Sequence, residues 1–229
     1  MILVIASIPL SAQEAPPAPS PSASGAVYKP PLRGAPGGRV GGGSRSAVKS
    51  AAALPIIDVV APADHTGETA TATPTLYFYV SGPVPFPTQL TIAAPLRAAP
   101  VLEVTIASPP ARGLYTLRLA DYRAQLDPGI IYTWSVSAIV DAQHWSHNVV
   151  ASATILRVTP TASDLAAKSP VARAAFLGDS GLWYDAVAAA FDAQSLDHRA
   201  ALDELLAEVG LNEAVSVDRA VSGNAPAIR

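Results

Sequence analysis

The alternation of apolar and polar residues along the middle of this chain predicts a β-sheet protein. Within residues 130–140, Tyr132, Trp134 and Val136 fall on one face of an extended segment, with Thr and Ser residues between them. This period of two is typical of a strand with one buried side. The Tyr follows a Pro-Gly turn, where its hydroxyl can bond back across the turn as a tyrosine corner.

Seven short apolar runs follow one another along the chain, separated by turn residues. They cover residues 56–60, 75–81, 90–94, 101–107, 114–119, 130–140 and 149–158. Strands at this spacing, without helical periods between them, favour a sandwich over alternating βαβ units. We expect a mainly β fold, with a sandwich over residues 54–160. Its strands resemble those of the immunoglobulin and fibronectin type III class, whose constant type has seven.

Helical periodicity replaces the period of two after residue 160. Apolar residues recur every three or four positions within 182–191 and again within 202–209, as on the buried faces of helices. We expect two or three helices that form a C-terminal α-helical hairpin over residues 161–212, with Asp179 or Ser180 placed to cap a helix start. Residues 213–229 are expected to form a disordered tail.

The N-terminal part of the chain has a different composition. Residues 1–10 are apolar and are followed by small residues, which predicts a signal peptide over residues 1–15 and a periplasmic or secreted protein. The apolar run contains no Lys or Arg, so an apolar terminus without export is the alternative. It is also shorter than the roughly 20 residues of a membrane helix, and we expect no integral membrane span. Residues 16–53 are Pro-rich and then Gly-rich, which predicts a disordered tether.

Charge divides the chain in the same way. The formal net charge is −3, but residues 15–57 contain five Lys and Arg and no acid. Arg33, Arg39 and Arg45 on this segment are therefore candidates for contact with an acidic surface, either the protein's own or a partner's, or with a polyanion. The Gly-rich run lacks the strand, helix and Gly-Lys-Ser/Thr of a phosphate-binding loop. We expect no cofactor and no nucleic-acid partner.

Catalytic chemistry finds little support in the sequence. The absence of Cys excludes disulfides, a thiol nucleophile and a lipid-modified Cys. The Gly-Asp-Ser-Gly segment around Ser180 is spelled like a serine-hydrolase motif, but the His and Asp segments that should accompany it are missing. We expect a non-enzymatic protein. The alternative is a hydrolase of unknown substrate that uses Ser180 or surface carboxylates.

Two features fall in the loop expected between the last two strands. Asp141, His144 and His147 are spaced in threes, as metal ligands can be, but no fourth ligand is evident and we expect no metal site. Trp145 lies at the expected tip of this loop. It is the aromatic residue that we expect to be exposed and available for a contact.

Five ordered blocks carry a family resemblance. They are residues 28–43, which begin Tyr-Lys-Pro-Pro; 61–67, Ala-Pro-Ala-Asp-His-Thr-Gly; 74–79, Pro-Thr-Leu-Tyr-Phe-Tyr; 119–122, Leu-Ala-Asp-Tyr; and 181–186, Gly-Leu-Trp-Tyr-Asp-Ala. Together they resemble bacterial domain-of-unknown-function family 928. The resemblance implies an exported bacterial protein and no particular chemistry. We therefore expect a binding or accessory protein of the bacterial envelope, with an unknown envelope protein as partner.

Overall fold

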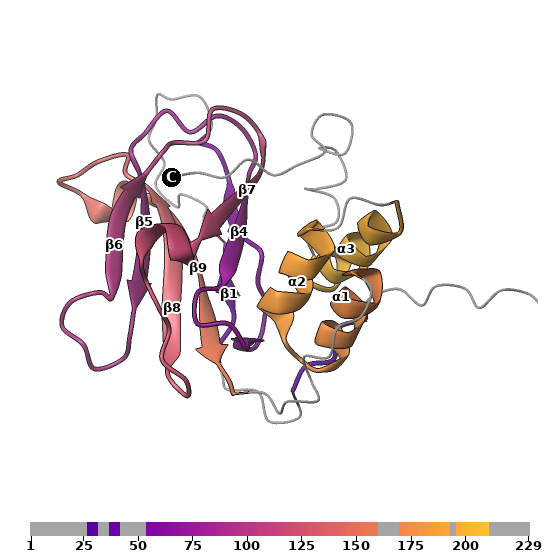
Figure 1. Cartoon of the computed structure of the whole chain (residues 1–229). Helices are drawn as coiled ribbons and strands as arrows, with labels where there is room; N and C mark the ends of the chain where they lie inside the picture. Colours follow the sequence, from indigo (N-terminus) through magenta and orange to yellow (C-terminus); the bar gives the residue numbers. More distant parts are fainter. Residues whose placement is uncertain (1–26, 32–36, 42–53, 160–169, 193–195, 211–229) are drawn as a thin grey trace, which may run out of the picture.

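The computed structural model describes residues 27–31, 37–41, 54–159, 170–192 and 196–210. Two β-sheets are accompanied by three helices, which form a layer on one side of them (Figure 1). The strands are β1 Arg39–Val40, β2 Ile57–Val59, β3 Gly67–Thr69, β4 Thr75–Val80, β5 Thr88–Ala93, β6 Leu102–Ile106, β7 Gly113–Arg118, β8 Ile131–Ala138 and β9 Val149–Arg157. The helices are α1 Pro170–Asp179, α2 Trp183–Asp192 and α3 Leu196–Glu208, with short 3-10 turns at Leu119–Tyr122 and Trp145–His147.

The two sheets differ in size. The larger has the strand order β1-β9-β8-β5-β6, and β3 joins it by pairing with β9 in parallel. The smaller has the order β2-β4-β7 and is antiparallel. Each of the seven apolar runs forms one strand, so the prediction of a mainly β, two-sheet fold followed by helices is confirmed. Strands β1 and β3 were not predicted.

The face of β8 assigned from the sequence is the buried face. Tyr132, Trp134 and Val136 are at most 1% exposed. The indole Nε1 of Trp134 donates to the hydroxyl of Tyr184 on α2 at 2.9 Å, and this hydroxyl donates to the carbonyl of Thr154 on β9 at 3.1 Å. The ring of Trp134 therefore packs in the sheet core, and its indole N–H has a hydrogen-bond partner on helix α2.

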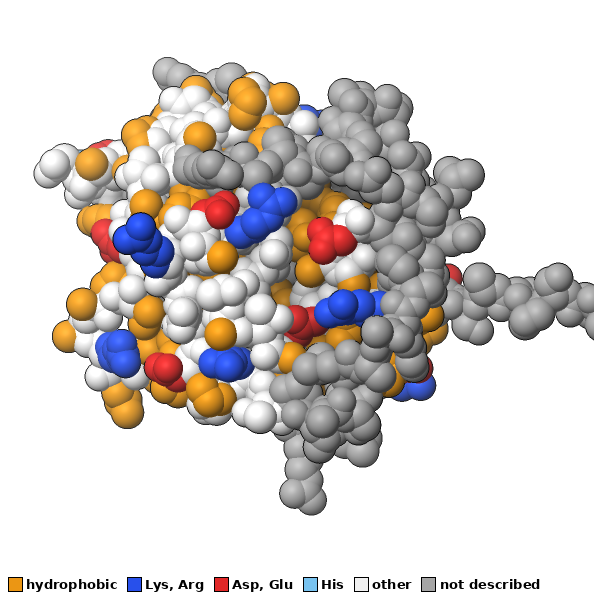
Figure 2. Space-filling model, viewed as in Figure 1, with side chains coloured by type: hydrophobic (Ala, Val, Ile, Leu, Met, Phe, Trp, Pro, Cys, Tyr) orange, Lys and Arg blue, Asp and Glu red, His pale blue; other side chains and the backbone are white. Residues whose placement is uncertain are grey.

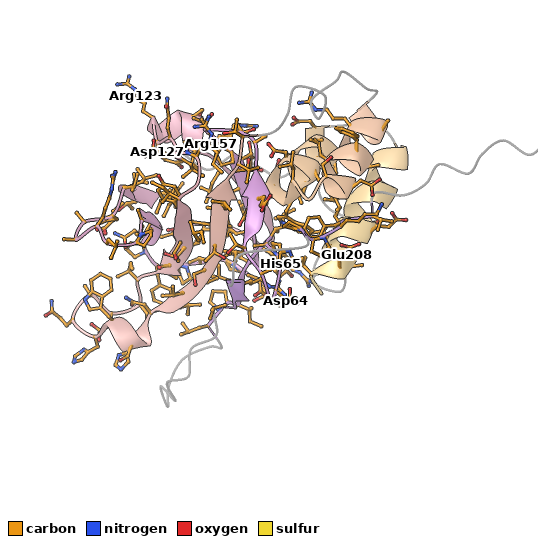
Figure 3. All side chains as sticks on the ribbon, turned by 90° about the horizontal axis from the view of Figure 1, so that it is seen from below. Asp64, His65, Arg123, Asp127, Arg157 and Glu208 are labelled. Atoms are coloured by element: carbon orange, nitrogen blue, oxygen red, sulfur yellow. The ribbon has the colours of Figure 1, made fainter. Side chains whose placement is uncertain are left out.

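The predicted tyrosine corner is present. The hydroxyl of Tyr132 accepts a hydrogen bond from the backbone N–H of Asp127 at 3.1 Å. The guanidinium of Arg157 on β9 donates to the carbonyl of Leu126 at 2.9 Å, which ties the same turn to the last strand (Figure 3). The hydroxyl of Tyr115 on β7 is hydrogen-bonded in a similar way to the backbone of Ala111, in the turn before that strand.

The C-terminal part contains three helices, in agreement with the two or three that the periodicity predicts. Gly181, with a φ of 77°, follows the end of α1, and the N–H of Leu182 bonds to the carbonyl of Leu177 at 2.9 Å. This left-handed Gly ends a helix. The hydroxyl of Ser180 donates back to the carbonyl of Phe176 at 2.8 Å, and Asp179 is the last residue of α1. The prediction that one of these two residues caps a helix start is therefore wrong.

The helical layer is joined to the sheets through α2. The indole of Trp183 donates to the carbonyl of Val60 at 3.3 Å, and the carboxylate of Asp185 accepts from the backbone N–H of Ala70 at 2.7 Å. Phe191 stacks on Tyr77 of β4, with ring centroids 4.2 Å apart. Sheets and helices therefore share one buried apolar cluster.

Two parts of the predicted tether are packed against this body. In residues 27–31, the N–H of Lys29 donates to the carbonyl of Gly178 at 3.0 Å. In residues 37–41, β1 pairs with the edge of β9 that faces away from β8, and so provides hydrogen-bond partners for backbone groups at that sheet edge. The prediction of a tether over 16–53 is wrong for these residues. The rest of it, the predicted signal peptide and the predicted tail lie outside the described residues.

Candidate functional site

The loop between β8 and β9, residues 139–148, carries the candidate functional site. It lies at the side of the sheets away from the helices (Figure 1). Its base is closed by Asn148, whose buried side-chain oxygen accepts hydrogen bonds from the backbone N–H groups of Val140 at 2.9 Å and Asp141 at 3.1 Å. These bonds fix where the loop leaves and rejoins the sheet.

Asp141 organises the loop interior. Its Oδ1 accepts hydrogen bonds from the backbone N–H groups of Gln143 at 2.8 Å and His144 at 3.2 Å. Its Oδ2 lies 2.7 Å from Nδ1 of His144 and 3.4 Å from Nδ1 of His147. The bonds from the Gln143 backbone and the His144 ring lower the pKa of Asp141 to about 2, and the carboxylate is ionised at neutral pH.

The two imidazoles of the loop lie side by side. The rings of His144 and His147 stack with centroids 5.2 Å apart. One possible ligand atom from each of these residues and from Asp141 lies within 4.8 Å of the others. The sequence placed these residues in one loop, and the structure brings their side chains together.

Trp145 is exposed, as the sequence analysis predicted. Its exposed fraction is 70%, whereas Trp134 and Trp183 are fully buried. It begins the 3-10 turn between the two imidazoles, Trp145–His147. The loop therefore presents one large apolar ring to solvent beside a cluster of titratable groups.

The other predicted interaction residues lie elsewhere. Arg39 is half-buried in β1, and its guanidinium donates to the carbonyl of Val209, just after α3, at 2.6 Å. A cation near the carbonyl end of a helix is favourable, and Arg39 thus contacts the protein's own helical layer. Arg33 and Arg45 lie outside the described residues. On the face seen in Figure 2, basic side chains lie among acidic ones rather than in one patch.

Ser180, the residue of the hydrolase alternative, is exposed just after α1. Its hydroxyl is engaged with its own helix through the bond to Phe176. This arrangement is that of a helix end, and the bond directs the hydroxyl toward a carbonyl, which cannot act as a general base.

A second constellation, at the junction of the sheets and helices, was missed by the sequence analysis. The hydroxyl of Tyr28 lies 2.8 Å from Nε2 of His65, and Nδ1 of His65 lies 2.8 Å from Oδ1 of Asp64. The Tyr28 ring stacks on His65 and meets Trp183 edge-on. Its backbone N–H donates to Oε1 of Glu208 at 3.2 Å (Figure 3).

Burial is the main cause that raises the pKa of Tyr28, and the carboxylates of Glu68, Glu208 and Asp64 add to it. The phenol is therefore protonated at neutral pH. It can donate to Nε2 of His65, which leaves Nδ1–H to donate to Asp64. This chain of bonds anchors the segment 27–31. Tyr28 and His65 both fall within the sequence blocks that carry the family resemblance. Membership of these blocks was the signal in the sequence that could have drawn attention to them.

Comparison with known proteins identifies the family. The model of the Domain of Unknown Function (DUF928) family matches residues 40–218. This chain belongs to the DUF928 family. The match spans the sheets, the helices and the loop 139–148, and it begins after the Tyr28 segment.

Other comparisons add little to the DUF928 assignment. No curated protein matches the chain. An engineered protein solved by crystallography is similar over 47% of this chain, with 16% identity and a TM-score of 0.32. The similarity covers only 21% of that engineered protein. No helix in the part of the chain that the structure describes is long and apolar enough to cross a membrane.

Proposed function

We propose that this DUF928 protein is an exported, non-enzymatic binding or accessory protein of the bacterial envelope, and that the loop 139–148 is its contact surface. The observation that carries the proposal is the 70% exposure of Trp145 in a protein whose other two Trp are fully buried. Aromatic side chains of this size dominate many protein interfaces, because they bury a large apolar area with few rotatable bonds.

The loop is also suited to binding because it is held in place before a partner arrives. Asn148 closes its base, and Asp141 bonds to two backbone N–H groups within it. A surface ordered in advance loses less conformational entropy on association. On the face seen in Figure 2, charges of both signs are mixed, so this face is not one that would attract a polyanion through a single sign of charge.

We further propose that the two sheets form a sandwich of the immunoglobulin and fibronectin type III class. The order β2-β4-β7 corresponds to strands A, B and E of that class, and β5-β8-β9 corresponds to C, F and G. The tyrosine corner supports this, since Tyr132 lies near the start of β8, the strand that corresponds to F. In such domains loops at the ends of the sheets commonly carry binding.

The binding proposal is tested by capture with two matched variants. The mature protein, Trp145→Ala and Leu96→Ala are each used to capture proteins from a bacterial envelope fraction, followed by quantitative mass spectrometry. Leu96 is the control, because it is also an exposed apolar residue but lies in the loop between β5 and β6. We expect partner capture to be lost with Trp145→Ala and kept with Leu96→Ala. Equal capture by all three proteins would place the contact surface elsewhere.

The export proposal has its own measurement. The apolar residues 1–10 and the small residues after them support cleavage between Ala12 and Pro16. Mass spectrometry of the protein isolated from its host should show a mature N-terminus in that interval. An intact Met1 on a cytoplasmic species would rule export out.

A further inference from the structure

The loop 139–148 contains the donor set of a transition-metal site. Asp141 supplies a carboxylate oxygen, and His144 and His147 supply imidazole nitrogens, all within seven residues of chain. One ligand atom from each lies within 4.8 Å of the other two. Imidazole with carboxylate suits zinc, nickel and copper ions, whereas magnesium and calcium favour ligand sets of oxygen alone.

The separations between these atoms are close to those of a coordination sphere. Ligands about 2.1 Å from a tetrahedral zinc ion lie about 3.4 Å from one another. Oδ2 of Asp141 lies 2.7 Å and 3.4 Å from the two Nδ1 atoms. To admit an ion, the contact of Oδ2 with Nδ1 of His144 has to lengthen by about 0.7 Å, whereas that with Nδ1 of His147 already has the required length.

The remaining oxygen of the carboxylate is fixed in the way that metal ligands commonly are. Oδ1 of Asp141 accepts from two backbone N–H groups, and the Asp141 N–H donates to the buried Asn148. Such outer-shell bonds orient a ligand and lower the cost of binding the ion. The His144 side chain is 66% exposed and that of His147 is 38% exposed, so the fourth position of the site faces solvent.

We propose that Asp141, His144 and His147 bind one divalent transition-metal ion of the zinc, nickel and copper group, with water or a partner's side chain as the fourth ligand. The sequence alone did not predict the site, because no fourth protein ligand is in view. An open fourth position removes that objection, since zinc sites with three protein ligands keep one position for water or substrate. Because Trp145 lies between the two His ligands in sequence, binding of the ion would affect the conformation of the loop surface that carries Trp145.

Calorimetry on the purified, tag-free protein tests the proposal directly. Titration with Zn²⁺ at neutral pH should give one ion per chain, and Mg²⁺ should give no binding at the same concentrations. His144→Ala and His147→Ala should each weaken Zn²⁺ binding at least about tenfold, because each removes one of three ligands. Gln143→Ala should bind as the unmodified protein does, since Gln143 contributes only its backbone to the loop.

Fluorescence gives an independent location for the ion. Cu²⁺ quenches nearby indoles, and Trp145 is the exposed indole beside the site while the other two are buried. One equivalent of Cu²⁺ should quench emission in the unmodified protein but not in Trp145→Phe, which should still bind Zn²⁺. Absence of one-to-one Zn²⁺ binding, or equal binding by His147→Ala at an unchanged melting temperature, would overturn the site. The proposal does not depend on the envelope partner, because these measurements use the purified protein alone.

Discussion

Single hydroxyl and carboxyl groups set the local order of this protein. The tyrosine corner at Tyr132 and the contact of Tyr115 with Ala111 each use a phenol to hold a turn against a strand. The alternation along residues 130–140 predicted the first of these, because the corner depends on a turn and a strand that adjoin in sequence. The Tyr28–His65 contact could not be predicted in this way, since its partners are 37 residues apart.

Replacing Tyr132 by Phe should lower the free energy of unfolding by about 1 kcal/mol, because the Asp127 N–H loses its partner while the ring stays buried. Urea denaturation measures this change. Tyr115→Phe is the matched variant and should cost at least as much, since its hydroxyl donates to the Ala111 carbonyl at 2.7 Å and accepts from the Ala111 N–H. A Tyr132→Phe variant as stable as the unmodified protein would contradict the role of the corner.

Glu68 on β3 should make stability depend on pH. Burial raises the pKa of Glu68 above its ordinary value of 4.5, and the electrostatic interaction with His65 partly opposes this. Ionisation is therefore harder in the folded than in the unfolded protein, and its cost is full above the raised pKa and absent below the ordinary one. Glu68→Gln should raise the melting temperature at pH 7, and the gain should disappear toward pH 4.

The control for this comparison is Glu103→Gln, which removes one negative charge from an exposed position on β6. Both variants lose one negative charge, but only Glu68→Gln removes a partly buried carboxylate. A difference between their melting temperatures therefore reports the cost of burying that carboxylate. A gain in melting temperature for Glu68→Gln that is the same at pH 4 and pH 7 would show that ionisation is not its cause.

At the scale of elements, periodicity predicts the long strands and misses the short ones. The seven predicted strands lie within apolar runs of five or more residues, and several of them alternate between buried and partly exposed positions, as β5 and β9 do. Strands β1 and β3 contain two and three residues and have no period to detect. They form because β9 offers open backbone groups, which is a property of the folded sheet. The predicted cap before α2 was wrong because Asp179 and Ser180 belong to the end of α1, which the left-handed Gly181 closes.

Two glycines with the same backbone conformation test how the N-terminal segment is held. Gly129 and Gly181 both have a φ of 77°, so Ala at either position should cost about 1 kcal/mol of strain. A methyl group at Gly129 would meet nothing within 4 Å, whereas one at Gly181 would lie 3.3 Å from the Lys29 carbonyl. Gly181→Ala should therefore also loosen residues 27–31.

Hydrogen exchange at the Lys29 amide, which donates to the Gly178 carbonyl, measures that loosening. Protection of this amide should fall in Gly181→Ala and remain in Gly129→Ala. Loss of protection in both variants would mean that the segment follows overall stability rather than the local fit at Gly181.

At the scale of the whole molecule, the helices are part of the core. The apolar cluster runs from the sheet residues through Trp134 to Trp183 and Leu205 without a break. The helical period of apolar residues predicted helices after the sheets. It could not say whether they pack on the sheets, because such a period shows that a helix face is buried but does not identify what covers it. The polar contacts of Tyr184 and Asp185 with the sheets decide the question.

Sheets and helices should therefore unfold together, and Tyr184→Phe should weaken both. Loss of the Tyr184 hydroxyl leaves the buried Nε1 of Trp134 without its partner, which costs about 1 to 3 kcal/mol. Thermal unfolding followed by far-ultraviolet and near-ultraviolet circular dichroism should show one coincident transition, shifted to lower temperature in the variant. Trp145→Phe is the control and should not shift it, because that ring is 70% exposed. Two separate transitions, with only the helical one moved by Tyr184→Phe, would show that the helical layer folds on its own and that its contacts with β8 and β9 do not stabilise the sheets.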